Sequence, residues 1–271
     1  MGIELTVDSA VDAVAQAFVL ARREAQVLSA YPGMAPNALA PAYAIQDRAI
    51  AIDGRKVIGW KVGRINPPLD GILGANRLAG PIFGDSVVDA IEGQVPDMPV
   101  FDGGFAAGEA ELLLHVAPGF AGPVPSDDDG TRAILDDVRL GIEIASSPYP
   151  GINTDGPAVT VSDFGNNAGM VRGAELAGWR DVDLCAIVVR SEINGIEVGK
   201  ATAATMLDGP YGAVRFLLGN LLERGFDVSQ GLWISTGAIT GVHEIALGQS
   251  FRAIFEGCGD VCCRVVAAQP R

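Results

Sequence analysis

The sequence contains few of the residues that hold zinc or form disulfides. Among its 271 residues are four cysteines and two histidines, and no two cysteines are spaced as C-x-x-C. Cys258, Cys262 and Cys263 lie close together, but their spacing does not match that of a zinc site. We therefore expect reduced, mostly buried thiols in a cytoplasmic protein.

Basic residues are also scarce. Lysine and arginine number 19 against 33 acidic residues, which gives a formal net charge of −14. This balance argues against nucleic acid or an anionic membrane as a partner, because both need basic patches. A small anionic substrate stays compatible with the sequence, since a lysine or a metal ion reverses the field inside one pocket.

Long hydrophobic runs are absent as well. No run of about 18 uncharged apolar residues occurs, so we do not expect a membrane-spanning helix. The first residues lack the basic and apolar regions of a secretory signal. Met1, Gly2 and Thr6 fit a loose myristoylation pattern, which is too short to carry weight.

The first part of the chain is expected to be helical. Asp8 or Ser9 is placed to cap a first helix, and a second helix begins at Pro41. We expect these two helices to form a cap on the rest of the protein. A strand over 56–63 and a long loop over 64–84 follow.

Most of the remaining sequence indicates β-structure. A strand over 184–193 runs into a hairpin turn at Asn194–Gly195, and an amphipathic helix lies between 208 and 225. Hydrophobic residues make up 49% of the chain, enough for a sizeable core. We divide the chain into an N-terminal segment, 1–78, and a β-rich catalytic core, 79–271.

Two glutamates lie one residue apart in an apolar run that is typical of a strand. Glu109 and Glu111 therefore project from the same face. Glu143 lies in a second strand-like run and is flanked on its own face by Gly141 and Ala145, which leave room for a metal ion. Buried like charges need a cation or a shared proton, and three carboxylates suit a hard divalent ion. A solvated sheet face with exposed glutamates is the alternative that the pattern leaves open.

Short motifs along nearly the whole chain resemble those of the fumarylacetoacetate hydrolase superfamily. Their order matches the branch of 2-keto-4-pentenoate hydratases and 4-oxalocrotonate decarboxylases. The matching segments are Tyr43–Gln46, Gly59–Gly63, Phe83–Asp85, Glu109–Glu111, Gly141–Ile144, Asn166–Ala168, Leu207–Pro210 and Ser235–Gly237.

The resemblance implies an α+β fold, a mixed β-sandwich roll with the N-terminal helical cap. It also implies Mg²⁺ or Mn²⁺ held by Glu109, Glu111 and Glu143. Homo-oligomers are frequent among such proteins, and a complex with a related decarboxylase is a further expectation.

The resemblance assigns roles to five other residues. Lys61 approaches the bound 2-oxo acid, and Asp85 is the candidate for proton transfer near the reacting carbons. Asn166, Asn167 and Thr236 are expected to bind substrate. Without the resemblance, Lys61 is as well explained as a strand-end lysine and Asp85 as a turn residue.

The implied reaction is the addition of water to a 2-hydroxy-2,4-dienoate in the breakdown of aromatic compounds, giving a 4-hydroxy-2-oxo acid. Decarboxylation of a 4-oxalocrotonate-type acid, and a catalytically silent member that binds metal or a partner enzyme, are the alternatives. Carbon–carbon bond hydrolysis is disfavoured, because no histidine precedes His115 to activate water. The loop over 67–74 and Gly169 depart from the pattern of the hydratases, so the substrate need not be the simple pentadienoate.

Overall fold

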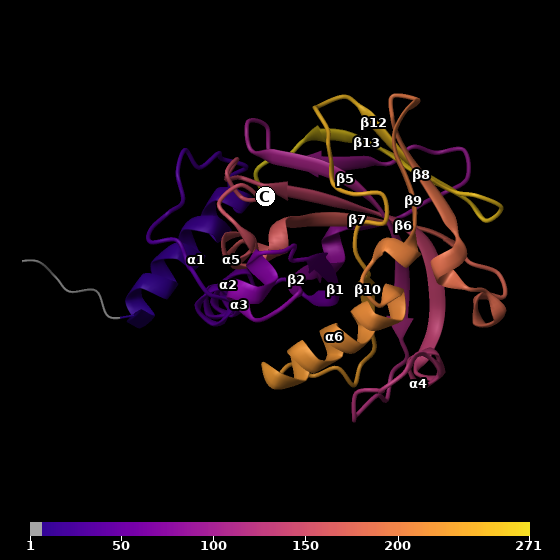
Figure 1. Ribbon diagram of the computed structural model, residues 1–271. Helices are drawn as coiled ribbons and strands as arrows, with labels where there is room; N and C mark the ends of the chain where they lie inside the picture. The colour runs from indigo at the N-terminus through magenta and orange to yellow at the C-terminus, as the bar shows by residue number, and fades with distance from the viewer. Residues whose placement is uncertain (1–6) are drawn as a thin grey trace, which may run out of the picture.

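The computed structural model describes residues 7–271, so the weak myristoylation pattern at Met1, Gly2 and Thr6 lies outside the described residues. Within that range none of the helices is long and apolar enough to cross a membrane. The helices are α1 (Val7–Arg23), α2 (Leu39–Asp53), α3 (Leu69–Leu73), α4 (Asp128–Ala133), α5 (Pro157–Ser162) and α6 (Gly209–Glu223). Figure 1 shows α1, α2, α3 and α5 gathered on one side and α6 lying apart from them.

The strands form two mixed sheets. They are β1 (Val57–Arg64), β2 (Arg77–Phe83), β3 (Val87–Asp89), β4 (Asp97–Val100), β5 (Phe105–Val116), β6 (Leu135–Ser147), β7 (Asn167–Glu175), β8 (Val188–Ile193), β9 (Ile196–Thr202), β10 (Leu232–Ser235), β11 (His243–Glu244), β12 (Ser250–Phe255) and β13 (Gly259–Ala267). The larger sheet has the order β2-β1-β10-β5-β6-β7-β3, with β11 also paired to β5, and the smaller one the order β4-β13-β12-β8-β9. The expected α+β class with helices at the N-terminal side is confirmed.

The two sheets approach each other where the larger one carries glycine. A Cβ on Gly108 of β5 would lie 2.6 Å from the ring of Phe251 on β12, and a Cβ on Gly173 of β7 would lie 2.4 Å from Val261 on β13. Phe251 is fully buried. These two positions therefore require glycine for close packing of the layers.

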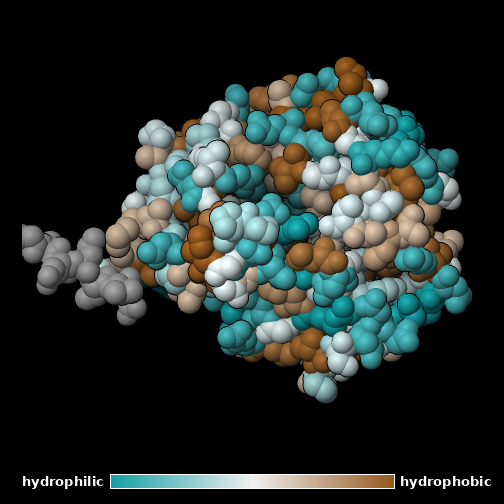
Figure 2. All heavy atoms as spheres, viewed as in Figure 1, coloured by the Kyte–Doolittle hydropathy of each residue, from teal (hydrophilic) through white to brown (hydrophobic). Residues whose placement is uncertain are grey.

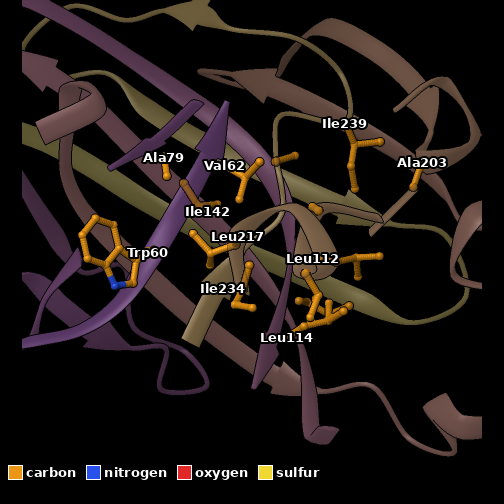
Figure 3. Close-up of a cluster of buried hydrophobic side chains, with 14 of the residues drawn as sticks. Trp60, Val62, Ala79, Leu112, Leu114, Ile142, Ala203, Leu217, Ile234 and Ile239 are labelled. Atoms are coloured by element: carbon orange, nitrogen blue, oxygen red, sulfur yellow. The ribbon is translucent and has the colours of Figure 1, made fainter. Parts of the chain in front are cut away.

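The main core lies between the sheets and continues beneath α6. Figure 3 shows Val62 of β1, Leu112 of β5 and Ile142 of β6 in one cluster with Leu217 of α6. A second apolar cluster joins α1 and α2 through side chains such as Phe18. On the outside, Figure 2 shows hydrophilic residues over most of the visible face, with hydrophobic ones in separate patches.

Several sequence-based boundaries need correction. The predicted loop over 64–84 contains α3 and the whole of β2, whose residues are all buried. Its Pro and Gly content suggested a loop, but pairing with β1 satisfies the backbone of 77–83. The strand predicted over 184–193 begins at Val188, after a 3₁₀ turn over 184–186.

The predicted helices are present, with small differences at their ends. The first begins at Val7, so Asp8 and Ser9 lie inside its first turn and not at the cap position. The second begins at Leu39, two residues before the predicted start at Pro41, and ends before Gly54. Residue 78, where the two predicted segments meet, lies inside β2, which pairs with β1 along its length.

The third predicted helix is α6, which begins after Asp208. Of its leucines, Leu217, Leu218 and Leu221 are buried, whereas Leu222 is 40% exposed. The hairpin turn at Asn194–Gly195 joins β8 to β9 with both residues at positive φ, as its sequence predicts.

Candidate metal centre

The three glutamates meet on adjacent strands of the larger sheet. β5 and β6 pair antiparallel in a register that sets Glu109 directly opposite Glu143 and Glu111 opposite Gly141. One ligand oxygen from each glutamate lies within 4.8 Å of the others, and within residues 7–271 no other group of three such residues is found. Glu111 and Glu143 are fully buried and Glu109 is 4% exposed. The alternative of a solvated sheet face is therefore wrong.

Burial makes this acidic group unstable as free carboxylates. Burial raises the pKa of Glu109 to about 7, with Lys61 opposing that rise and Glu143 adding to it. The pKa of Glu111 is raised well above its ordinary value, first by burial and then by Glu143 and Glu109. A carboxylate in low dielectric beside another one favours its protonated form unless a cation is close. Among residues 7–271, the ammonium of Lys61 is the cation that lowers the pKa values of Glu109 and Glu111.

Lys61 lies on β1, which is separated from β5 by β10. Its Nζ lies 3.2 Å from a carboxylate oxygen of Glu143, and its side chain is 5% exposed. Burial by itself would lower the pKa of Lys61, but the carboxylates of Glu143, Glu109 and Glu111 together raise it above its ordinary value. The amine is therefore charged at neutral pH.

The glutamate oxygens are only partly satisfied by hydrogen bonds. Oε2 of Glu111 accepts from the hydroxyl of Ser235 at 2.5 Å and from the backbone N–H of Gly237 at 2.9 Å. Oε1 of Glu143 accepts from the side-chain amide of Asn167 at 3.0 Å. The remaining oxygen of Glu111 and that of Glu143 are buried and lack a hydrogen-bond partner among residues 7–271. Two unpartnered buried oxygens in a three-carboxylate group fit a hard divalent cation.

The room for such an ion does not come from Gly141, as the sequence suggested. A Cβ at Gly141 would lie 2.4 Å from Leu113, whose side chain fills that space. Gly141 is needed because Leu113 projects from the same face of β5 as Glu109 and Glu111. Small residues on that face therefore serve packing beside the acidic group.

Asn166 is held beside Lys61 by an unusual backbone segment. Phe164, Gly165 and Asn166 have φ of 54°, 62° and 57° in succession, in the left-handed region. The side-chain oxygen of Asn166 accepts from Lys61 Nζ at 3.4 Å, and its amide donates to Asn153 at 3.0 Å. Two non-glycine residues in this conformation store strain that surrounding contacts must offset, a feature typical of functional sites.

The other predicted substrate-binding residues also lie here. Thr236 donates from its hydroxyl to the backbone oxygen of Leu112 at 2.8 Å, which fixes the segment after β10 against β5. Asn167 contacts Glu143, so the structure places it against a candidate ligand residue.

A cavity of about 680 Å³ opens onto this group. Lys61, Glu109, Asn166 and Thr236 all line it. Asn153 lines it too and was missed, because no motif surrounds it in the sequence.

The structure does not bring Asp85 into this cavity. It lies in the 3₁₀ turn after β2 with its side chain 54% exposed, and Nη1 of Arg55 is 3.2 Å from its carboxylate. It lines a separate hollow that includes Arg22 and Arg271.

Neither histidine joins the acidic group. His115 lies in β5 beyond the glutamates, 2.6 Å from Asp136. His243 does not line the cavity, but its Nε2 is 3.0 Å from the hydroxyl of Thr240, which does. Burial lowers the pKa of His243, so the ring is neutral at pH 7.

Known proteins share this architecture. A 4-oxalocrotonate decarboxylase from Pseudomonas putida is 30% identical over 247 residues, covering 89% of each chain. A 2-keto-4-pentenoate hydratase from Dechloromonas aromatica is 26% identical, covering 81% of this chain and 83% of its own. The crystal structure of 4-oxalocrotonate decarboxylase from Pseudomonas putida G7 with magnesium and adipate superposes with a TM-score of 0.78 at 25% identity, covering 98% of this chain and all of that one. No protein-family model matches the chain.

Two mixed sheets with N-terminal helices and a buried trio of glutamates define an α+β protein with a candidate metal centre in its larger sheet. The chain belongs to the fumarylacetoacetate hydrolase superfamily, in its hydratase and decarboxylase branch.

Proposed function

We propose that this protein is a divalent-metal-dependent lyase that acts on a 2-oxo carboxylic acid or its enol. The observation that carries the proposal is the buried trio Glu109, Glu111 and Glu143, with two carboxylate oxygens that lack a hydrogen-bond partner among residues 7–271. These three residues would hold Mg²⁺ or Mn²⁺, since both prefer oxygen ligands. When bound, the ion supplies Lewis acidity that polarises the 2-oxo group and stabilises developing negative charge.

The residues around the trio support such a substrate. Lys61 lines the cavity and is positively charged at neutral pH, so it attracts the carboxylate of the acid in a chain that is otherwise strongly acidic. Asn166 holds the Lys61 ammonium in place through its side-chain oxygen. Thr236 lines the same cavity, and its hydrogen bond to the backbone oxygen of Leu112 fixes the wall after β10.

Two lyase reactions share this machinery. Addition of water to a 2-hydroxy-2,4-dienoate is the reaction that the motifs favoured, and loss of CO₂ from a vinylogous 2-oxo acid needs the same electron sink. The identity of 30% to a decarboxylase, against 26% to a hydratase, gives added support to decarboxylation as the second candidate. Asp85 has no part in the proposal, because it is exposed and paired with Arg55.

The test is to follow dienoate loss and CO₂ release separately, with Mg²⁺ and with a chelator. Glu109→Gln and Glu143→Gln should abolish Mg²⁺-dependent turnover. Glu223→Gln removes an exposed carboxylate of α6 and is the matched control, which should leave turnover intact. Full activity in the first two variants would refute the site, and no turnover of any 2-oxo acid by the wild type would favour the silent member.

A further inference from the structure

More than one cationic side chain lines the cavity. Besides Lys61, it is lined by Arg64 at the end of β1 and by Arg77 at the start of β2. These two arginines face each other in the register of β1 and β2. Three cations around one cavity stand out in a chain with a net charge of −14.

Two of the three cations are already neutralised. Lys61 is 3.2 Å from Glu143, and Arg77 is only 7% exposed and pairs with Asp208 ahead of α6. Arg64 differs from both. It is exposed, its one hydrogen bond goes to the backbone oxygen of Thr205 at 3.3 Å, and no ion pair to a carboxylate is found for it within residues 7–271.

A guanidinium without a carboxylate partner is suited to bind one. Its planar fork donates two parallel hydrogen bonds to a carboxylate, which adds orientation to the charge attraction. The backbone oxygen of Thr205 takes only one of the five donors of Arg64, so donors stay available toward the cavity.

Lys61 and Arg64 lie three residues apart on β1 and line the same cavity. Three residues along a strand separate their Cα atoms by about 10 Å. The carboxyl carbons of an extended six-carbon diacid lie roughly 6 Å apart, given C–C bonds of about 1.5 Å. The side chain of Arg64 leaves β1 on the other face from Lys61, but Val62, which shares the parity of Arg64, and Gly63 both line the same cavity, so the cavity wraps around the strand end.

We infer that Arg64 binds the far carboxylate of a dicarboxylic 2-oxo acid, and so determines specificity for dicarboxylates over monocarboxylates. This inference rests on the proposed function, which places the 2-oxo end at Lys61 and the glutamates. In the addition of water, the far carboxylate takes no part in the reaction, so the contribution of Arg64 is to binding.

The test measures binding by calorimetry to the Mg²⁺-loaded full chain with two unreactive probes, adipate and hexanoate. They have the same number of carbons and differ by one carboxylate. Arg64→Gln should weaken adipate binding roughly ten- to 150-fold, the range for a lost hydrogen bond to a charged group, and leave hexanoate binding unchanged. Arg64→Lys should recover part of the loss, because it keeps the charge without the fork.

Arg180→Gln is the matched control. Arg180 is also exposed, donates to one backbone oxygen, that of Leu135 at 3.2 Å, and has no ion pair to a carboxylate within residues 7–271, but it does not line the cavity. Circular dichroism of each variant checks folding.

The inference would be overturned if Arg64→Gln weakened the binding of adipate and hexanoate equally, or if the wild type did not bind adipate more tightly than hexanoate. The readout does not depend on turnover. If Arg64→Gln selectively weakened adipate binding but the wild type converted no 2-oxo acid, the proposed reaction would be refuted. The role of Arg64 in binding the far carboxylate would still be supported.

Discussion

Metal-free protein should lose stability as the pH rises from about 5 to 8, because the fold buries carboxyl groups that resist ionisation. Burial raises the pKa of Glu109 from 4.5 to about 7, and Glu109 is 4% exposed in the folded chain. A difference of that size between folded and unfolded states corresponds to about 3 kcal/mol of unfolding free energy. Glu111, whose pKa is raised by burial and by its acidic neighbours, adds to the effect in the same direction.

The sign follows from which state binds the proton more tightly. The folded state holds the proton of Glu109 up to about pH 7, whereas the unfolded chain releases it near 4.5. The stabilising contribution is therefore complete below pH 4.5 and is lost as the pH rises through 7. His243 acts in the opposite direction, because burial lowers its pKa in the folded state. Its effect on the unfolding free energy is therefore to increase stability as the pH rises through the ordinary pKa of histidine.

The assay is guanidinium unfolding at several pH values between 5 and 8, in a chelator and in Mg²⁺. Glu109→Gln separates the effects, because it keeps His243 and removes the carboxyl group. Wild type in chelator should lose stability relative to Glu109→Gln by about 3 kcal/mol across this range, and Mg²⁺ should remove most of that loss. Parallel pH profiles for the two proteins in chelator would refute the reasoning.

Three further predictions concern residues inside and outside the centre. Lys61→Met should lower kcat/KM at least about 100-fold, because it removes a fixed charge that faces the substrate, with steady-state kinetics as the measurement; retention of wild-type values would count against its role. Arg22→Leu should lower the unfolding free energy by about 3–5 kcal/mol, since it leaves the buried carboxylate of Asp163, 2.6 Å from Arg22, without its partner; denaturant titration measures this, and a loss below 1 kcal/mol would contradict it. Asp85→Asn should leave turnover within about twofold of wild type, because its half-exposed side chain points into a different hollow, and a large loss of activity would return Asp85 to the reaction.

Local rules predicted those features that depend on neighbours in the chain. Strand alternation put Glu109 and Glu111 on one face, because successive side chains point to opposite sides wherever the strand lies. The helix predicted between 208 and 225 is α6 for a similar reason, since Pro210 fits the first turn of a helix and helix ends depend on the backbone groups of one turn. The ordered motifs then indicated the superfamily, which the relatives confirm.

Local rules failed where a distant strand supplied the missing partner. The segment 77–83 lies in a stretch rich in Pro and Gly, which favoured a loop. It forms β2 because it pairs with β1 along its length. The space at Gly141, beside Glu143, is filled by the side chain of Leu113 from the neighbouring strand. The sequence around Gly141 does not predict this contact. Asn153 lines the cavity and accepts a hydrogen bond from Asn166, a contact between residues 13 positions apart that no local pattern predicts.

By itself the sequence determined that two glutamates share a face and that a third lies on a face with small neighbours. Only the tertiary structure decided that they meet, because the register of β5 and β6 sets Glu109 opposite Glu143. It also decided that Lys61 reaches them from a strand two places away, and that Asp85 does not. The reason is physical: alternation is a property of one strand, whereas the closeness of charges depends on pairing between strands that are far apart in the chain.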